Sequence, residues 1–279
     1  MQNQENENEK IGKKEEQRIN DLFIRNIGTL SIEDQLTIVK TKIGIAGCGI
    51  GSEVARQLTR FGFTISALAD PDIVEIHNLN RQSYHHNQVG KKKVEALLEK
   101  LKLINPDQKP ELFPDGITKK NYKKFVDLCD IVVDGIDPSA INLSVAIARE
   151  AQRQNKHVIT ALDFGFGARL FVFAPDGMDI MDFLKIDKNT TDEAMLKMPI
   201  DKIMASYMED APEYIWQILK TILSGELNYY PQNILAVAQS AVLIVTACKR
   251  VALNQPIVLA PKYVHIDTDL MLNDEADGE

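Results

Sequence analysis

Short apolar runs alternate with amphipathic stretches along much of the chain. The run over residues 42–48 ends in glycines, a helical pattern follows over 52–61, and a second apolar run covers 64–69. In residues 91–104, apolar side chains recur at intervals of three and four, which predicts a helix with one buried face. The Asn-Pro pair at 105–106 ends that helix. This order predicts strand, helix, strand, helix.

The same alternation continues after residue 129. Strands are predicted over 130–137, 157–162 and 169–174, and a helix over 139–154. Strands separated by helices of this length are typical of a parallel sheet that is covered on both faces. The fold class predicted is therefore α/β, with a Rossmann-like, mostly parallel sheet.

The pattern changes between residues 176 and 232. Strand signals vanish there, and six of the eight methionines lie between Met178 and Met208. Methionine is flexible and polarizable, so this segment could adapt to a substrate, or its methionines could simply fill a small core. We predict a helical insert or substrate lid over 176–232, between a core of residues 21–175 and a helix and strand within 233–272 that complete it.

Both ends of the chain are polar. Nine of the first twenty residues are charged, and residues 273–279 are acidic, so we expect disordered tails over 1–20 and 273–279. Nothing in the first twenty residues has the pattern of a signal peptide. The longest uncharged apolar stretch, 234–248, has fifteen residues, and a bilayer needs about 20. We therefore predict a buried helix, no membrane partner and a cytoplasmic location.

Composition narrows the classes of function. The chain of 279 residues has 32 basic and 40 acidic residues, a net charge of −8, which argues against a general nucleic-acid binder but leaves a local basic patch open. Its three cysteines, Cys48, Cys129 and Cys248, contain no C-x-x-C pair. They therefore predict neither a disulfide framework nor a zinc clip, and they suit a reducing compartment.

A glycine-rich loop is the first candidate site. Gly47, Gly49 and Gly51 stand between a predicted strand and a predicted helix, where glycine lets the backbone approach a phosphate and the helix N-terminus attracts it. The third glycine comes one residue earlier than in G-x-G-x-x-G, and a tight turn alone could use the same residues. Asp70, 19 residues after Gly51, ends the second strand, as a ribose-binding acid does. Together they predict an adenine-nucleotide site and leave NAD and ATP open.

Two cations after this acid favour a triphosphate. The sequence continues through Asp72 to Asn78-Leu79-Asn80-Arg81-Gln82, and Lys93 follows a Val-Gly pair. A dehydrogenase does not need such cations, whereas a triphosphate and its leaving pyrophosphate need positive charge to offset their own.

This series of motifs resembles the ThiF/MoeB family, the bacterial relatives of ubiquitin-activating enzymes. That family has a glycine-rich loop, D-x-D-x-V-E, S-N-L-x-R-Q, V-G-x-x-K and a trailing N-P. The resemblance extends upstream to residues 23–28, which contain Arg25, and downstream to Asp130, Asp134 and Asp137, which match a D-x-x-x-D-x-x-D strand.

The resemblance implies a role for each matching residue. The roles are a phosphate loop of Gly47, Gly49 and Gly51, ribose binding by Asp70, support of the loop by Asp72, a triphosphate clamp of Asn78, Arg81 and Lys93, Mg²⁺ binding by Asp137, and action of Arg25 across a dimer interface. Alternatives stay open: Arg81 and Lys93 could be solvated surface charges, and Asp137 could cap the following helix.

The chain also departs from the family. It lacks the zinc tetrad, so no zinc is expected, and none of its cysteines is placed as a nucleophile for a thioester. Pro138 stands where an Asn commonly follows the metal-binding aspartate, and the glycine loop is short.

The resemblance thus implies an ATP- and Mg²⁺-dependent adenylyltransferase that works as a homodimer. Its substrate would be the carboxylate of a small molecule, a peptide or the C-terminus of a ubiquitin-like protein, with tRNA the one nucleic acid to consider. Two alternatives remain: a catalytically degenerate nucleotide- or partner-binding protein on the same scaffold, and, from the Rossmann-like elements alone, an NAD-dependent oxidoreductase.

Overall fold

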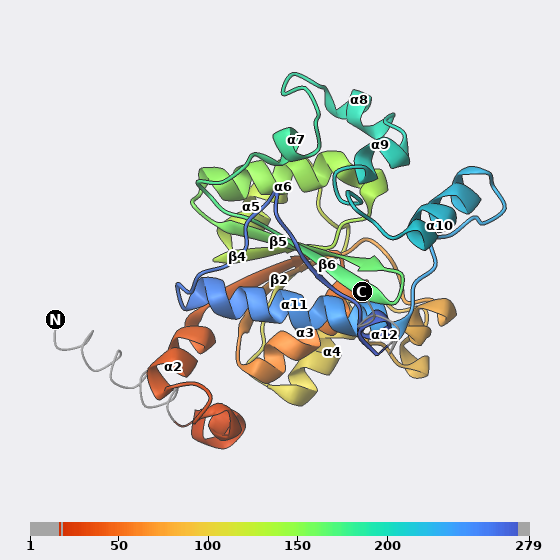
Figure 1. Ribbon diagram of the computed structural model, residues 1–279. Coiled ribbons are helices and arrows are strands. Elements are labelled where there is room, and N and C mark those ends of the chain that lie inside the picture. The colour runs from red at the N-terminus through yellow and green to blue at the C-terminus, as the bar shows by residue number, and fades with distance from the viewer. Residues whose placement is uncertain (1–16, 18, 273–279) are drawn as a thin grey trace.

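A seven-stranded sheet forms the centre of the molecule (Figure 1). The computed structural model describes residues 17 and 19–272; most of the predicted tail 1–20 and all of 273–279 lie outside them. The strand order is β3-β2-β1-β4-β5-β6-β7. The strands are β1 Lys42–Ala46, β2 Thr64–Ala69, β3 Glu111–Phe113, β4 Ile131–Asp134, β5 His157–Phe164, β6 Gly167–Phe173 and β7 Val264–Ile266.

The pairing of the strands is mixed. β1 to β5 pair in parallel, and β6 and β7 join the sheet antiparallel. The predicted α/β class with a mostly parallel, Rossmann-like sheet is confirmed.

Helices cover both faces of the sheet. One face carries α3 (Ile50–Phe61), α4 (Lys93–Ile104) and α11 (Ile234–Ala252), and the other carries α5 (Tyr122–Asp127) and α6 (Ile141–Arg153) (Figure 1). The remaining helical elements outside the insert are η1 Ile19–Phe23, η2 Ile24–Asn26, α2 Ile32–Lys40, η3 Ile76–Asn80, η4 His86–Gln88, η5 Pro138–Ala140 and α12 Thr268–Met271.

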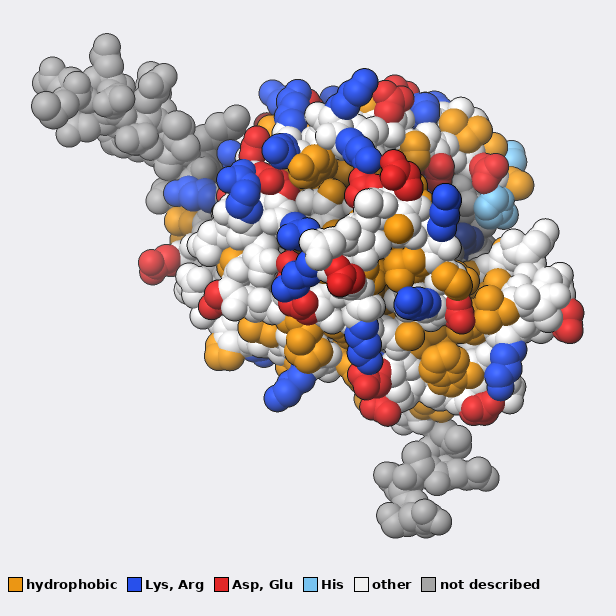
Figure 2. Space-filling model, turned by 90° about the horizontal axis from the view of Figure 1, so that it is seen from above, with side chains coloured by type: hydrophobic (Ala, Val, Ile, Leu, Met, Phe, Trp, Pro, Cys, Tyr) orange, Lys and Arg blue, Asp and Glu red, His pale blue; other side chains and the backbone are white. Residues whose placement is uncertain are grey.

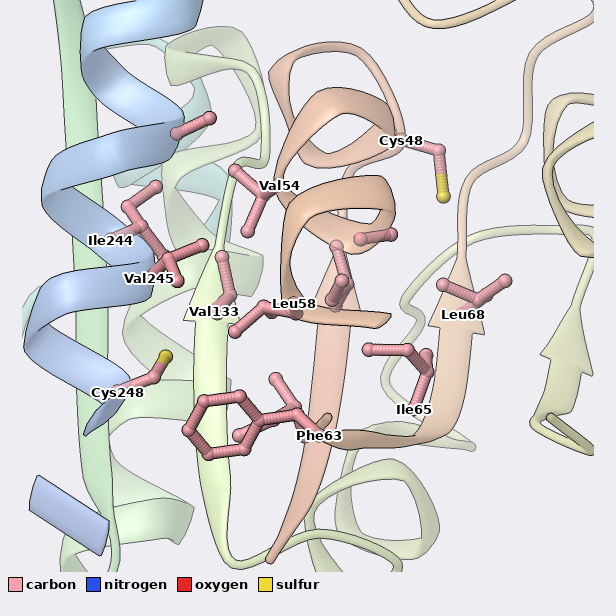
Figure 3. Packing of buried hydrophobic residues seen from close by; sticks show 14 of the residues in the cluster. Cys48, Val54, Leu58, Phe63, Ile65, Leu68, Val133, Ile244, Val245 and Cys248 are labelled. Atoms are coloured by element: carbon pink, nitrogen blue, oxygen red, sulfur yellow. The ribbon is translucent and has the colours of Figure 1, made fainter. Parts of the chain in front are cut away.

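Each covered face of the sheet has its own apolar cluster. In the cluster beneath α3 and α11, Val54 and Leu58 of α3 point toward Ile244 and Val245 of α11 and toward Val133 of β4 (Figure 3). Burying such a side chain contributes roughly 1.5–3 kcal/mol. This packing fixes the start of α3, and with it the glycine loop, against the sheet.

α11 has the length and composition of a membrane span. A core helix meets the same test, and α11 packs against α3, β5 and β6. Buried residues such as Ala241 and Ile244 line its inner face. The structure therefore accounts for its apolar sequence by packing.

The segment for which the sequence predicts an insert forms four short helices beside α6 and the sheet (Figure 1). They are α7 Ile180–Phe183, α8 Asp192–Leu196, α9 Ile200–Met204 and α10 Glu213–Leu223. Met181, Met195 and Met208 are buried, and the other three methionines of the segment pack against the same clusters. Of the two interpretations of this methionine-rich stretch, the structure shows the core-filling one.

Candidate functional site

The predicted site lies where parallel strands end at one edge of the sheet. β1 pairs with β2 on one side and β4 on the other, so the chain order reverses between β1 and β4. Ligands of open α/β sheets bind at the carboxyl ends of the strands, at such a switch point. The loops that follow β1, β2 and β4 contain most of the residues that the sequence singles out.

The glycine loop requires glycine at two positions. Gly47 has φ +89°, and a Cβ there would lie 2.1 Å from the carbonyl oxygen of Gly135; a Cβ on Gly51 would lie 2.7 Å from Cγ2 of Ile45. Gly49 is the N-cap of α3. The loop is thus a tight turn, and it leads into the N-terminus of a twelve-residue helix, whose partial positive charge favours an anion.

Asp70 ties the two loops together. Its side chain is almost fully buried. One carboxylate oxygen, Oδ2, accepts the backbone N–H of Cys48 at 2.6 Å, and the other, Oδ1, accepts that of Asp72 at 2.8 Å. From the far side of the loop, the Tyr84 hydroxyl donates to the carbonyl of Cys48 at 2.8 Å. Asp70 therefore shapes the glycine loop, in addition to the ribose contact predicted for it.

Lys93 is buried beside two carboxylates. Its Nζ lies 2.8 Å from Oδ2 of Asp72 and 4.0 Å from Oδ1 of Asp70, and only 8% of its side chain is exposed. The alternative that Lys93 is a solvated surface charge is therefore wrong. Asp72 itself is exposed, so the pair lies at the surface end of the buried lysine.

Arg81 is held by three protein acceptors. Its Nε donates to Oε1 of Gln232 at 2.8 Å, and its Nη1 donates to the carbonyl of His77 at 3.1 Å and to Oδ1 of Asn80 at 2.8 Å. Among the described residues these bonds use Nε and Nη1, which leaves Nη2 for a ligand. The guanidinium is thus oriented by the protein, although the side chain is only half-buried.

Two amide side chains complete this side of the site. Oδ1 of Asn78 accepts the backbone N–H of Glu75 at 3.0 Å, so a phosphate contact would have to use Nδ2. Gln82, to which the sequence analysis assigned no role, lies against Gly49, and its Oε1 is buried without a partner among the described residues. A buried acceptor without a partner is costly, and a ligand donor over the glycine loop would satisfy it.

Asp137 is an exposed residue in the loop that follows β4. β4 ends at Asp134, three residues before the predicted end, so Asp137 belongs to the turn. Its Oδ1 accepts the N–H of Ser139 at 2.8 Å, and Pro138 takes the first position of η5, where proline is well tolerated. Asp137 therefore does cap the next element, and because the side chain is exposed, its other oxygen could still bind Mg²⁺.

Arg25 lies away from these loops. It is exposed on η2, and its neighbour Asn26 donates to the carbonyl of Phe61 at 3.2 Å, at the far end of α3. A helix of twelve residues is about 18 Å long. A contribution from Arg25 would therefore require a second copy of the chain, and its role across a dimer interface stays a prediction.

Two residues that sequence reasoning missed adjoin Arg81. Asp163, near the end of β5, is buried and accepts from Nε2 of Gln232 at 3.0 Å and from the Ser240 hydroxyl at 3.0 Å. Burial raises its pKa to about 6. The only signal in the sequence is a carboxylate that interrupts an apolar run at the end of a predicted strand.

The arrangement fits a nucleotide triphosphate with Mg²⁺. The glycine loop leads into the N-terminus of α3, and Arg81 and Lys93 supply positive charge beside it. No group of three or more His, Cys, Asp or Glu side chains that could hold a metal occurs within the described residues. A Mg²⁺ ion bound by Asp137 would therefore share its coordination with phosphate oxygens and water, as Mg²⁺ commonly does.

The three thiols do not suit covalent catalysis. Cys48, Cys129 and Cys248 are all buried. Burial raises the pKa of Cys129 to about 12, and it raises the pKa of Cys48 and of Cys248 as well. The thiolate is the nucleophile, so none of these groups is prepared to form a thioester.

Known proteins share both sequence and fold with this chain. The profile of the ThiF family matches residues 23–269. The chain is 35% identical over 126 residues to ubiquitin-like modifier-activating enzyme 5 of Caenorhabditis elegans, a match that covers 41% of this chain and 30% of that enzyme. It is 28% identical over 148 residues to the sulfur carrier protein ThiS adenylyltransferase of Escherichia coli (strain K12), covering 52% of this chain and 58% of that protein.

Among solved structures, the fold is similar to that of E. coli MccB with ATP. The TM-score is 0.59 at 22% identity, and the match covers 85% of this chain and 62% of that chain. This likeness concerns the fold. The matches span less than two thirds of the length of each of these three relatives.

Proposed function

Because this chain belongs to the ThiF family, we propose that it is an ATP- and Mg²⁺-dependent adenylyltransferase that activates a carboxylate. The observation that carries the proposal is the meeting of the glycine loop, the Asp70–Lys93 pair and Arg81 with the Asp137 loop at the carboxyl ends of β1, β2 and β4.

In the proposed reaction, an oxygen of the substrate carboxylate attacks the α-phosphorus of ATP. The bond between the α- and β-phosphates breaks, and the products are an acyl adenylate and pyrophosphate. Mg²⁺, when bound, would offset phosphate charge and polarise the α-phosphorus. Arg81 and Lys93 would stabilise the charge that develops on the leaving pyrophosphate, while Asp70 keeps the glycine loop in the shape that accepts the phosphates.

The proposed acceptor is the carboxylate of a small molecule or of a peptide or protein C-terminus. On the face seen from above in Figure 2, basic and acidic side chains are interspersed without a continuous basic stripe, unlike a nucleic-acid footprint. The relatives include a ubiquitin-like modifier-activating enzyme and an adenylyltransferase of a sulfur carrier protein. Because its thiols are buried, this chain would pass on the acyl adenylate itself, without a thioester of its own.

ATP–pyrophosphate exchange tests the proposal. Labelled pyrophosphate, ATP and Mg²⁺ would be incubated with pools of small carboxylates and of peptides with free C-termini. We expect label to enter ATP with at least one pool, to depend on Mg²⁺, and to be lost in Arg81→Ala but kept in Arg60→Ala, an exposed arginine at the end of α3. ATP binding without exchange in any pool would indicate the degenerate nucleotide-binding alternative, and binding of NAD⁺ but not ATP would indicate an oxidoreductase.

A further inference from the structure

The last residues of the insert cross from the β5 end to the arginine of the site. The Tyr230 hydroxyl donates to the carbonyl of Asp163 at 3.3 Å, and the side chain of Asn233 donates to the carbonyl of Gly165 at 2.8 Å. Between them, the carbonyl of Gln232 accepts from Asn80 at 3.2 Å. The exit of the insert is therefore fastened to both sides of the site.

The side chain of Gln232 bridges Arg81 and Asp163 through two hydrogen bonds. Arg81 can only donate, so it must face the amide oxygen, and Asp163 accepts from the amide nitrogen. The observed bonds follow this order: Nε of Arg81 to Oε1 at 2.8 Å, and Nε2 to Oδ2 of Asp163 at 3.0 Å. A glutamine with these two partners has one orientation of its amide.

Asp163 fixes the position of the Gln232 side chain. It is 5% exposed, the hydroxyl of Ser240 on α11 donates to its other oxygen at 3.0 Å, and no ion pair to it occurs within the described part of the chain. The charge of Asp163 also acts on Arg81, where it opposes the larger effect of burial, which lowers the pKa of the guanidinium. Because the carboxylate of Asp163 is buried and hydrogen-bonded to α11, its position is fixed, and it holds the amide of Gln232 in place.

We propose that Gln232, held by Asp163, is a positioning residue for Arg81 and couples the docking of the 176–232 insert to the binding of the triphosphate. This inference rests on the nucleotide site of the proposed function. With Nε and Nη1 occupied by protein acceptors, the guanidinium presents Nη2 to a ligand from one orientation. The entropy of ordering a long side chain is then already lost before ATP binds.

Coupling of this kind is reciprocal. If the docked insert strengthens the grip of Arg81 on the phosphates, bound phosphates must stabilise the docked insert. A substrate that binds beneath the insert would then raise the affinity for ATP. AMP lacks the β- and γ-phosphates and should not report on Arg81.

The test compares the dissociation constants of ATP and AMP by calorimetric titration of the full chain. Without Gln232 the guanidinium must be ordered when ATP binds, so we expect Gln232→Ala to bind ATP on the order of ten-fold more weakly, or about 1.4 kcal/mol, and AMP as the wild type does. Gln217→Ala, an exposed glutamine on α10 of the same insert, is the matched control and should bind both nucleotides normally.

Asp163 provides a rescue series. Asp163→Asn keeps an oxygen that can accept from Gln232 and should retain most of the ATP affinity, whereas Asp163→Ala should resemble Gln232→Ala. Limited proteolysis reports on the other direction of the coupling. ATP should slow cleavage within residues 176–232 of the wild type, and should not do so in Gln232→Ala.

The outcomes separate the two proposals. If the wild type binds no ATP, the nucleotide function fails and the coupling fails with it. If the wild type binds ATP and Gln232→Ala binds it equally well, the coupling alone is refuted. Equal weakening of ATP and AMP in Gln232→Ala would show that the residue only maintains the fold, which also overturns the coupling.

Discussion

Replacement of Asp70 by Asn should destabilise the protein although it changes little in shape. The carboxylate of Asp70 accepts the N–H groups of Cys48 and Asp72, one on each oxygen. An asparagine has one accepting oxygen, so its NH₂ group must face one of these two donors. That backbone N–H then loses its acceptor in the protein, and the charge that faces Lys93 at 4.0 Å is lost.

The size of the effect follows from these bonds. A hydrogen bond to a charged group contributes about 1.5–3 kcal/mol, and a buried donor without a partner costs about 1–3 kcal/mol, so we expect a loss of about 3 kcal/mol in the free energy of unfolding. Unfolding entropy of about 2.1 cal/mol/K per residue, over 279 residues, converts this loss into a fall in Tm of about 5 °C.

Thermal unfolding of the wild type and two variants tests this reasoning. Asp72→Asn is the matched control, because the same change is made two residues away at an exposed carboxylate that contacts the same lysine. An asparagine there keeps an oxygen that can accept from Lys93, so we expect a loss of about 1 kcal/mol. We expect Tm to fall by about 5 °C in Asp70→Asn and by less than about 2 °C in Asp72→Asn. Equal shifts in the two variants would refute the view that Asp70 organises the glycine loop.

Three further predictions concern catalysis, assembly and pH. Asp137→Ala should abolish AMP transfer while circular dichroism stays close to the wild type and Tm falls by less than about 4 °C, the effect of losing one exposed helix cap; unchanged AMP transfer would remove it from the site. Light scattering at micromolar concentration should show a symmetric dimer, and a strict monomer would contradict the role of Arg25. Burial raises the pKa of Asp134 from 3.8 to about 6, so the folded protein holds this proton more tightly than the unfolded chain, and stability falls as pH rises from about 4 to 6. In urea titrations at pH 7, the free energy of unfolding of Asp134→Asn should therefore exceed that of the wild type by on the order of 3 kcal/mol. The difference should close near pH 4, and a difference that stays constant with pH would contradict this.

The main elements of the fold are readable from the sequence because their patterns are long or strongly apolar. β2 has the predicted bounds, and α4 begins two residues after the predicted start. No sequence pattern predicts α2, β3 or α5. β3 has only three residues, of which two are half-buried, and α5 has only six. Segments this short show no periodicity in the sequence, and their structure depends on the neighbouring elements.

The candidate site divides in the same way. The glycine loop, Asp70 and Lys93 could be predicted because they lie close together in the sequence, at the ends of consecutive strands and helices. Asp163 and Gln232 could not, because they meet across 69 positions. Their contact depends on how the end of the insert docks onto β5 and α11, and no local pattern in the sequence encodes that.

The central claim is that this edge of the sheet binds a triphosphate nucleotide together with Mg²⁺. Its most direct test is the change in Tm of the full chain with ATP and Mg²⁺, ATP alone, AMP and NAD⁺. A ligand at one hundred times its dissociation constant stabilises the folded state by about 2.7 kcal/mol, which corresponds to about 5 °C for a chain of this length. The account predicts the largest rise with ATP and Mg²⁺, a smaller one with ATP alone, and none with NAD⁺. A rise with NAD⁺ alone, or no rise with ATP at saturating concentration, would contradict it.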